Sequence, residues 1–424
     1  MDAGKHDAFG AVKNANYRLF AVAFGCSSFA LQMSGMALGW EIYERTGDPF
    51  LLGLMGVARA LPVVLMALPA GQLVDWFRRQ RVMMLTQAGF GIVMAAIAIA
   101  VHGVGGMRGS VWALLGLVSC MGMVRTFNGP ARNSLLPDLV PQEMFANAVT
   151  WNIGIFQASA IVGPLLAGWM IDKMKHSWGV FAVCSALCLI SSVLAWRLKP
   201  EREPEVVKGS ISLRGLWSGM GEGAKHVWRD KLILSTITLD LFAVLLGGAT
   251  GLLPVYAKDI LHVDAVGLGW LRAAPFLGAL GTSALLAARP IQRKAGPLLL
   301  ACVAIFGAAM IVFGFSTWFW LSMAALVIAG GVDGVSVVIR HVLVQMRTPA
   351  NLRGRVSSVN SVFIECSNEL GSFESGAVAK AVGGVYGATI GAIASVVSGG
   401  IGTILVVIGV GLTWRELWKL DRLK

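Results

Sequence analysis

Two apolar runs of spanning length, near residues 50–70 and 82–102, are separated by the sequence Gly71-Gln-Leu-Val-Asp75-Trp-Phe-Arg78-Arg-Gln-Arg81. A glycine lets two helix ends approach closely, and a carboxylate can cap a helix or pair with a cation. Clustered arginines stay with water and lipid phosphate on one side of a bilayer. The pattern therefore predicts a short charged loop between two membrane-spanning helices, with a mechanical rather than a catalytic role.

The composition of the whole chain agrees with this interpretation. Of 424 residues, 56% are hydrophobic and only 14% are charged, which is typical of a polytopic helical membrane protein. The net charge of +12 is explained by basic loops facing anionic lipid, so we expect the lipid bilayer and not nucleic acid as a partner. The six cysteines lie in apolar runs, which favours neither a disulfide framework nor a metal site.

Twelve apolar stretches of spanning length follow one another, six on each side of a long polar interval. We therefore expect an all-α membrane protein made of an N-terminal six-helix bundle (1–198), a cytoplasmic linker with an amphipathic helix (199–231) and a C-terminal six-helix bundle (232–424). The predicted spans are 18–40, 50–70, 82–102, 110–133, 146–171, 178–197, 232–256, 267–288, 297–316, 318–345, 356–382 and 387–412.

Lys and Arg are distributed unequally between alternate loops. Most of the 35 lie on the side that carries both termini and the linker. The positive-inside rule therefore predicts that both termini are cytoplasmic. The basic residues assigned to the other side are Arg45, Arg108, Lys173, Lys175 and Lys258.

The two halves are related to each other in sequence. An offset of 208 residues relates Arg132 to Arg340, and an offset of 213 residues relates Arg59 to Arg272. Such identities indicate a duplicated six-helix unit, which predicts pseudo-two-fold symmetry about an axis along the membrane normal and a cavity between the halves. The other related pairs are Pro141 and Pro349, Asn152 and Asn360, Gly163 and Gly371, Gly168 and Gly376, Tyr43 and Tyr256, and Pro62 and Pro275.

Three motifs connect the chain to a known family: the loop Gly71–Arg81, the segment Arg125-Thr-Phe-Asn-Gly129, and Gly154, Ser159 and Gly163-Pro-Leu-Leu-Ala-Gly168. Together they resemble the loop, the proton-coupling motif and the antiporter motif of the major facilitator superfamily. The last motif has Ala-Gly where two glycines are usual. The resemblance implies a transporter that works by alternating access, with a proton gradient in place of a cofactor.

The stretch from Arg347 to Gly376 is similar to the subgroup that contains the bacterial enterobactin exporter and related transmembrane secretion effectors. This resemblance implies export of a siderophore or drug through the cell inner membrane. We also expect a monomer.

Ionised side chains within spans are costly, so they pair with one another or line a water-filled path. For coupling to protons the sequence offers Glu369, Asp333, Arg125, Asp240 and Glu365. Two interpretations stay open: the carboxylates face the cavity, or they form permanent ion pairs. For Arg59, Arg272, Arg132 and Arg340, a structural role near the span ends is favoured.

Conformational locking is expected at the opening loop, involving Gly71, Asp75, Arg78, Arg81 and Asp138. We expect Asp75 to meet the start of the eleventh span near Arg353, while Arg78 and Arg81 hold the end of the fourth span at Asp138.

Small residues and proline have mechanical roles in membrane helices. For packing or gating, the fifth span offers Gly154, Gly163, Pro164 and Gly168. Candidates for lining a substrate cavity are Trp151, Phe156, Phe242, Phe276 and Asn360.

The sequence thus predicts a proton-coupled exporter, an antiporter, of a small apolar or amphipathic molecule. Two alternatives remain open, an uptake symporter or facilitator and a lysophospholipid flippase. An enzyme is not expected, because the chain has no metal-ligand cluster, nucleophile turn or phosphate loop.

Overall fold

A computed structural model describes residues 9–103, 109–200, 221–222, 224–247, 249–289, 291, 293–349 and 352–421, with no description of the side chains of 67–75, 358–359 and 361–362. The secondary structure of the described residues is helical. The chain divides into two compact units, one of Met1–Ala37 and Leu61–Ile211 and one of Leu38–Ala60 and Ser212–Lys424.

The described residues of unit 1 form six long helices and two short ones. The long helices are α2 (Ala15–Thr46) as far as Ala37, α3 (Pro49–Trp76) from Leu61, α4 (Arg79–His102), α5 (Val111–Leu139), α6 (Phe145–Met174) and α7 (Trp178–Trp196), and the short ones are α1 (Gly10–Lys13) and η1 (Gln142–Met144).

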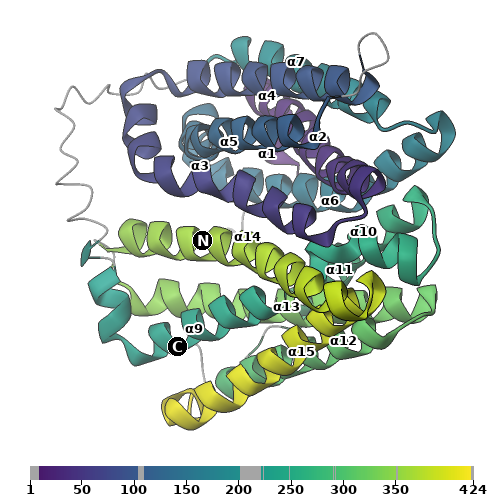
Figure 1. Cartoon of the computed structure of the whole chain (residues 1–424). Coiled ribbons are helices and arrows are strands. Elements are labelled where there is room, and N and C mark those ends of the chain that lie inside the picture. The colour runs from purple at the N-terminus through teal and green to yellow at the C-terminus, as the bar shows by residue number, and fades with distance from the viewer. Residues whose placement is uncertain are drawn as a thin grey trace. The chain divides into compact units, whose positions relative to one another are not determined.

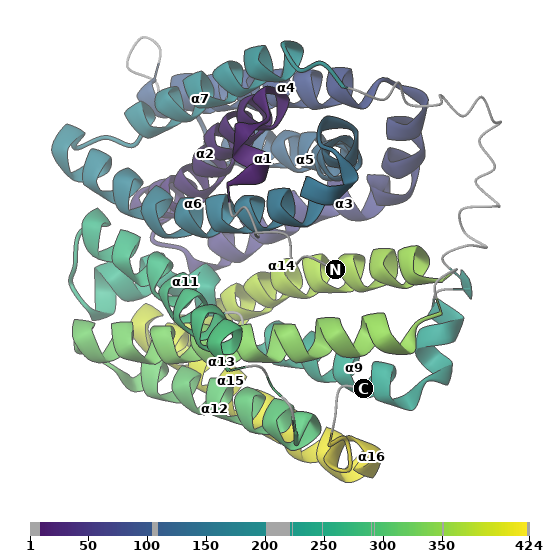
Figure 2. The same cartoon turned by 180° about the vertical axis from the view of Figure 1, so that it is seen from behind.

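Packing in unit 1 combines apolar contacts with buried polar ties. Helices α4 and α7 run side by side (Figures 1 and 2), and the Ser185 hydroxyl donates to the Gly91 carbonyl at 2.8 Å. The Tyr17 hydroxyl donates to the Ala148 carbonyl at 3.0 Å, which ties α2 to α6. Such hydrogen bonds satisfy polar groups that lipid could not.

Unit 2 contains the hairpin Leu38–Ala60 formed by α2 and α3, together with the second half of the chain. The elements of that half are α9 (Lys231–Leu246), η2 (Ala249–Leu252), α10 (Leu253–Val255), η3 (Tyr256–Ile260), α11 (Ala265–Ala288), α12 (Ala295–Phe315), α13 (Phe319–Arg347), α14 (Arg353–Tyr386), α15 (Ala388–Thr413) and α16 (Arg415–Trp418).

Close helix packing in unit 2 depends on glycine. A Cβ at Gly330 of α13 would overlap the carbonyl of Pro275 on α11, and a Cβ at Gly391 of α15 would overlap the carbonyl of Ala379 on α14. Without side chains at these points the backbones can touch, which is the usual way membrane helices gain dispersion contacts. At Gly387, between α14 and α15, φ is +98°, a conformation that favours glycine.

The expected twelve-helix membrane fold is confirmed, and one of its long helices differs from the others in polarity. Among the described residues, eleven helices are long and apolar enough to span a membrane by length and composition. The remaining long helix is α14, whose 34 residues exceed spanning length but include a polar face with Glu365, Asn368 and Glu369. A polar face on a spanning helix is tolerated where it meets protein or water rather than lipid.

The charged loop is shorter than the sequence predicted. Helix α3 continues to Trp76 and α4 begins at Arg79, so Gly71 and Asp75 lie in a helix and only Phe77 and Arg78 connect the two. Of the predicted linker, residues 201–220 and 223 are outside the described residues, whereas residues 221–222 and 224–229 are helical, with Val227 buried and Trp228 exposed.

Candidate functional site

A single arginine contacts two carboxylates in unit 2. Arg340 Nη1 of α13 contacts Asp240 Oδ1 of α9, and Arg340 Nη2 lies 3.7 Å from Asp333 Oδ1. The arginine is further held by its Nε, which donates to the Ser336 carbonyl at 3.3 Å. We call Asp240, Asp333 and Arg340 the acidic cluster.

Its two carboxylates differ in environment. The Asp240 side chain is 13% exposed and the Asp333 side chain 49% exposed, whereas the Arg340 side chain is 12% exposed. The Asp240 carboxylate is therefore enclosed with its cation, whereas the charge of the Asp333 carboxylate is only partly compensated by Arg340. Two acids and one base leave a formal charge of about −1 when all are ionised, so the cluster can accept one proton and keep an ion pair.

A recess opens beside the acidic cluster. It has an apolar wall and several polar groups, a combination typical of small-molecule sites. Its residues are Thr236, Ile237 and Asp240 from α9, Val337, Arg340, His341 and Val344 from α13, and Asn360 and Ile364 from α14.

A second charged cluster in unit 2 has the opposite composition. Arg59 Nη1 of α3 lies 3.5 Å from Glu369 Oε1 of α14, and Arg272 of α11 is within electrostatic reach of both. The Arg59 Nε is buried without a hydrogen-bond partner in the described part of the chain. We call Arg59, Arg272 and Glu369 the basic cluster.

The helices that carry Arg59 and Glu369 touch through their backbones. A Cβ at Gly56 would lie 2.8 Å from the Glu369 carbonyl oxygen, and a Cβ at Gly376 would lie 2.7 Å from the Pro49 carbonyl oxygen. Because side chains at these positions would force α3 and α14 apart, glycine here sets the distance between the arginine and the carboxylate.

Further polar contacts fix the same hairpin. The Tyr43 hydroxyl donates to Asp259, and Lys258 Nζ donates to Glu44 at 2.8 Å. Lys380 Nζ donates to Asp48 Oδ2 at 2.9 Å. The hairpin Leu38–Ala60 is thus fastened to η3 and α14 within unit 2.

The residues expected to form a lock are placed as follows. Asp138 at the end of α5 accepts from Arg79 Nη1 at 2.8 Å, and the same nitrogen donates to the Ser134 carbonyl at 3.0 Å. Arg79 is thus a partner of Asp138. The sequence had predicted Arg78 and Arg81 for this contact. Gly71 lies in α3, and the side chain of Asp75 is outside the described part of the chain.

The gating candidates on α6 behave differently from one another. A Cβ at Gly163 would lie 2.9 Å from Gln32 Cβ, so α6 and α2 are in close contact there, whereas a Cβ at Gly154 would meet open space. Pro164 and Gly168 are both buried.

The residues predicted to line a substrate cavity also lie in different environments. Trp151 packs on the core of unit 1, with its ring centroid 5.6 Å from that of Phe9. Phe156 and Phe242 are both 40% exposed. Asn360 lines the recess, whereas Phe276 is half-buried on α11.

Two coupling candidates are not members of either cluster. Arg125 lies in α5 of unit 1, and Glu365 is half-buried on α14. A role of Arg125 and Glu365 in proton coupling stays a prediction.

The arginine partners were the residues that sequence reasoning passed over. Arg340, Arg59 and Arg272 had been given structural roles, and the structure places each beside a coupling candidate. The internal repeat held a signal, since Arg59 and Arg272 are equivalent positions and both lie near Glu369.

The profile of the Major Facilitator Superfamily matches residues 20–372. The chain belongs to this superfamily. It is 28% identical over 366 residues to the multidrug efflux pump Tap of Mycobacterium tuberculosis (strain ATCC 25618 / H37Rv), covering 83% of this chain and 84% of that protein. It is 24% identical over 392 residues to the multidrug resistance protein MdtG of Yersinia enterocolitica, covering 87% and 88%.

Solved structures of transporters from this superfamily share the fold. A bacterial homologue of the human lysosomal transporter Spinster matches with a TM-score of 0.75 at 14% identity, covering 95% of this chain and 97% of that one. The nucleoside transporter NupG matches with a TM-score of 0.70 at 13% identity, covering 95% and 99%. The protein is therefore a multi-pass membrane transporter of the major facilitator superfamily and not an enzyme.

Proposed function

We propose that the protein exports small apolar or amphipathic molecules, such as drugs or siderophores, in exchange for protons. The observation that carries the proposal is the acidic cluster, in which Arg340 holds two carboxylates beside a recess lined by both apolar and polar side chains. The Tap and MdtG relatives, described as a multidrug efflux pump and a multidrug resistance protein, support the direction of transport.

The acidic cluster is suited to exchange because its charge can change by one without breaking every ion pair. A proton taken up by Asp333 or Asp240 leaves Arg340 with the other carboxylate. Loss of that proton to the cytoplasm restores the negative charge, and alternating access makes the two events occur on opposite sides. A cell inner membrane, cytoplasmic termini and a monomeric transporter belong to the same proposal.

Transport in everted membrane vesicles tests this proposal. Acidification of the lumen should drive accumulation of at least one of three probes, ethidium, tetraphenylphosphonium or Hoechst 33342, followed by fluorescence or a selective electrode. Asp240→Asn should reduce proton-driven accumulation by about tenfold or more, because the enclosed carboxylate can no longer exchange a proton. Asp172→Asn, in an exposed ion pair with Lys175 at the end of α6, is the matched control.

Other outcomes would change the assignment. Energised accumulation in right-side-out vesicles would replace export by an uptake symporter. Movement of lysophospholipid between leaflets, without movement of the probes, would indicate a flippase. Unchanged proton-driven transport in both Asp240→Asn and Asp333→Asn would remove the acidic cluster from the mechanism.

A further inference from the structure

Two polar contacts connect α9 and α13, and their order along the helices is informative. Asp240 of α9 meets Arg340 of α13, and Asp230, the residue before α9, meets Arg347 at the end of α13. Residue numbers rise along one helix as they fall along the other, so the helices are antiparallel here. The two contacts are separated by about 15 Å along α9 and about 10 Å along α13.

Apolar side chains fill the space between these contacts. Ile233 and Ile237 of α9 pack with Val344 of α13 in one buried cluster, which Val227 and Val356 complete. Along α9 and α13, Ile233, Ile237 and Val344 lie between the Asp230–Arg347 pair at one end and the acidic cluster at the other. Apolar packing by itself tolerates sliding, because dispersion contacts have little direction.

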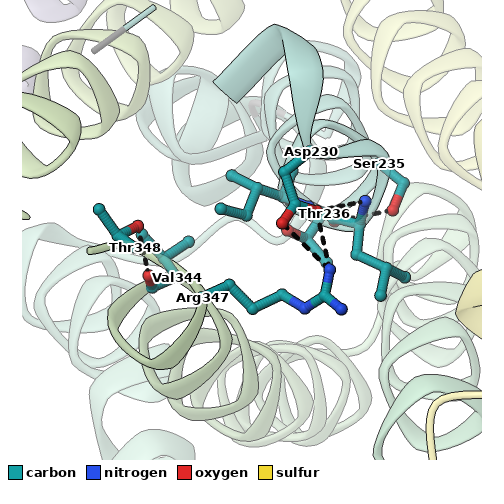
Figure 3. A network of polar contacts seen from close by, with 8 residues as sticks. Asp230, Ser235, Thr236, Val344, Arg347 and Thr348 are labelled. Carbon is teal, nitrogen blue, oxygen red and sulfur yellow. Dashed lines mark hydrogen bonds and ion pairs between the residues drawn. The ribbon is translucent and has the colours of Figure 1, made fainter. Parts of the chain in front are cut away.

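The Asp230 carboxylate is held in place by its own helix. Its Oδ1 accepts from the backbone N–H groups of Leu232 at 3.0 Å and Ile233 at 3.2 Å, which caps α9. Arg347 Nη1 donates to both carboxylate oxygens, at 3.1 and 3.0 Å (Figure 3). Because the cap fixes the carboxylate, the arginine holds the end of α9 itself rather than a mobile side chain.

The end of α13 is equally well defined. The Thr348 hydroxyl is buried and donates to the Val344 carbonyl at 2.6 Å, so the last turn is closed just beyond Arg347 (Figure 3). On α9, the hydroxyls of Ser235 and Thr236 donate to carbonyls of the same helix, at 2.9 Å each. These three hydroxyls are therefore satisfied within or next to their own helices, and among the described residues the Asp230–Arg347 pair is the ion pair between the two helix ends.

We propose that Asp230 and Arg347 are positioning residues for proton coupling, because they set the register of α9 against α13 and so bring Asp240 to Arg340. A slide of one helical turn, about 5.4 Å, would separate Asp240 from Arg340. The Arg347 side chain is 44% exposed, so the tie can open and close as the helices move. The inference rests on the proposed function for its consequence, but the register is testable without transport.

The first experiment measures the register directly. In a protein whose six native cysteines are replaced by alanine, Ile237→Cys and Val344→Cys are joined by a short bifunctional thiol reagent and the rate is followed on gels. Asp230→Asn keeps the cap but removes the charge, and Arg347→Gln removes the cation. Each should slow cross-linking by about fivefold, whereas Arg347→Lys should restore most of the rate.

The second experiment measures coupling with the probe that the wild-type protein moves in everted vesicles. Asp230→Asn and Arg347→Gln should lower proton-driven accumulation by about fivefold while changing probe exchange at equal pH by less than about twofold. A merely structural role would lower both activities together, per amount of folded protein. Lys175→Gln, which breaks an exposed ion pair at another span end, should change neither.

The outcomes separate the two proposals. Cross-linking rates unchanged in both variants would overturn the positioning role. Slower cross-linking with unaltered coupling would also overturn it, because the register would then not matter for Asp240. Absence of proton-driven transport in the wild-type protein, with the cross-linking result as expected, would instead contradict the proposed function.

Discussion

The acidic cluster and the basic cluster are built from the same residue types in opposite proportion. Arg340 lies between two carboxylates, whereas Glu369 lies near two arginines. When the acidic cluster gains a proton, one ion pair remains. When Glu369 gains a proton, two guanidinium groups are left near each other without a counter-charge, which is costly in a low-dielectric environment.

This difference favours different tasks for the two clusters. Proton exchange suits the acidic cluster because its formal charge is −1 when both carboxylates are ionised and zero when one is protonated. A structural tie suits the basic cluster, because its carboxylate is needed as an anion and is held by the glycine contacts between α3 and α14. Four substitutions test this contrast, and they follow in order of the loss of stability that we expect, the largest first.

Arg340→Gln should have the largest effect. It leaves the enclosed Asp240 carboxylate without its cation, and removal of one partner of a buried pair costs about 3–5 kcal/mol. The melting temperature of the detergent-solubilised protein should fall, and proton-driven transport should be lost. In the double variant Asp240→Asn/Arg340→Gln, stability should return while transport stays absent. A double variant no more stable than Arg340→Gln would contradict the assigned pairing.

Glu369→Gln should be the next most destabilising change, at about 2–4 kcal/mol, because Arg59 and Arg272 then lose their shared carboxylate. Thermal unfolding followed by fluorescence size-exclusion chromatography measures this. Adding Arg59→Gln should recover part of the loss. If Glu369→Gln instead removed proton coupling and left the melting temperature unchanged, the roles of the two clusters would be reversed.

Gly56→Ala should cost about 1–3 kcal/mol, because the new methyl group meets the Glu369 carbonyl of α14 and forces the two backbones apart. The same thermal assay measures the loss. Gly154→Ala is the control, since its methyl group meets open space. Equal effects of the two substitutions would show that the close contact with α14 does not hold the basic cluster together.

Asp333→Asn should be the mildest change in stability, at about 1 kcal/mol or less, because this carboxylate is half exposed and lies 3.7 Å from Arg340. Its effect should appear in transport instead, as a weaker dependence of probe accumulation on the imposed pH gradient. A large loss of stability would mean that Asp333, rather than Asp240, is the main partner of Arg340.

Much of the fold could be predicted from the sequence because hydrophobic runs report the bilayer directly. Helix α14 is not among the helices that qualify as spans by composition, yet residues 356–382 were predicted as a span, because the polar face is interspersed with enough apolar residues to form a run of spanning length. The predicted loop Gly71–Arg81 is longer than the observed connection between α3 and α4, since hydropathy marks where lipid ends and not where a helix ends. Helix α3 simply continues to Trp76 beyond the apolar stretch.

Only some residues of the candidate site could be predicted from the sequence. Asp240, Asp333 and Glu369 could be named because a carboxylate within an apolar run is conspicuous and costly. Their partners could not be named, because Arg59 and Glu369 are about three hundred residues apart and no local pattern records such a meeting. Nor could Arg79 be singled out as a partner of Asp138, because helical rotation decides which of several adjacent side chains faces a given helix.

A twelve-helix membrane transporter with ionised groups inside its spans could thus be predicted from the amino-acid sequence alone, since burial in lipid constrains every residue of a span in the same way. The folded protein was needed to show which charges meet, that one cluster has an excess of acid and the other of base, and that Asp230 and Arg347 tie α9 to α13. Ion pairs depend on helix rotation, register and close backbone contact, which arise from packing between distant segments and not from the composition of any one of them.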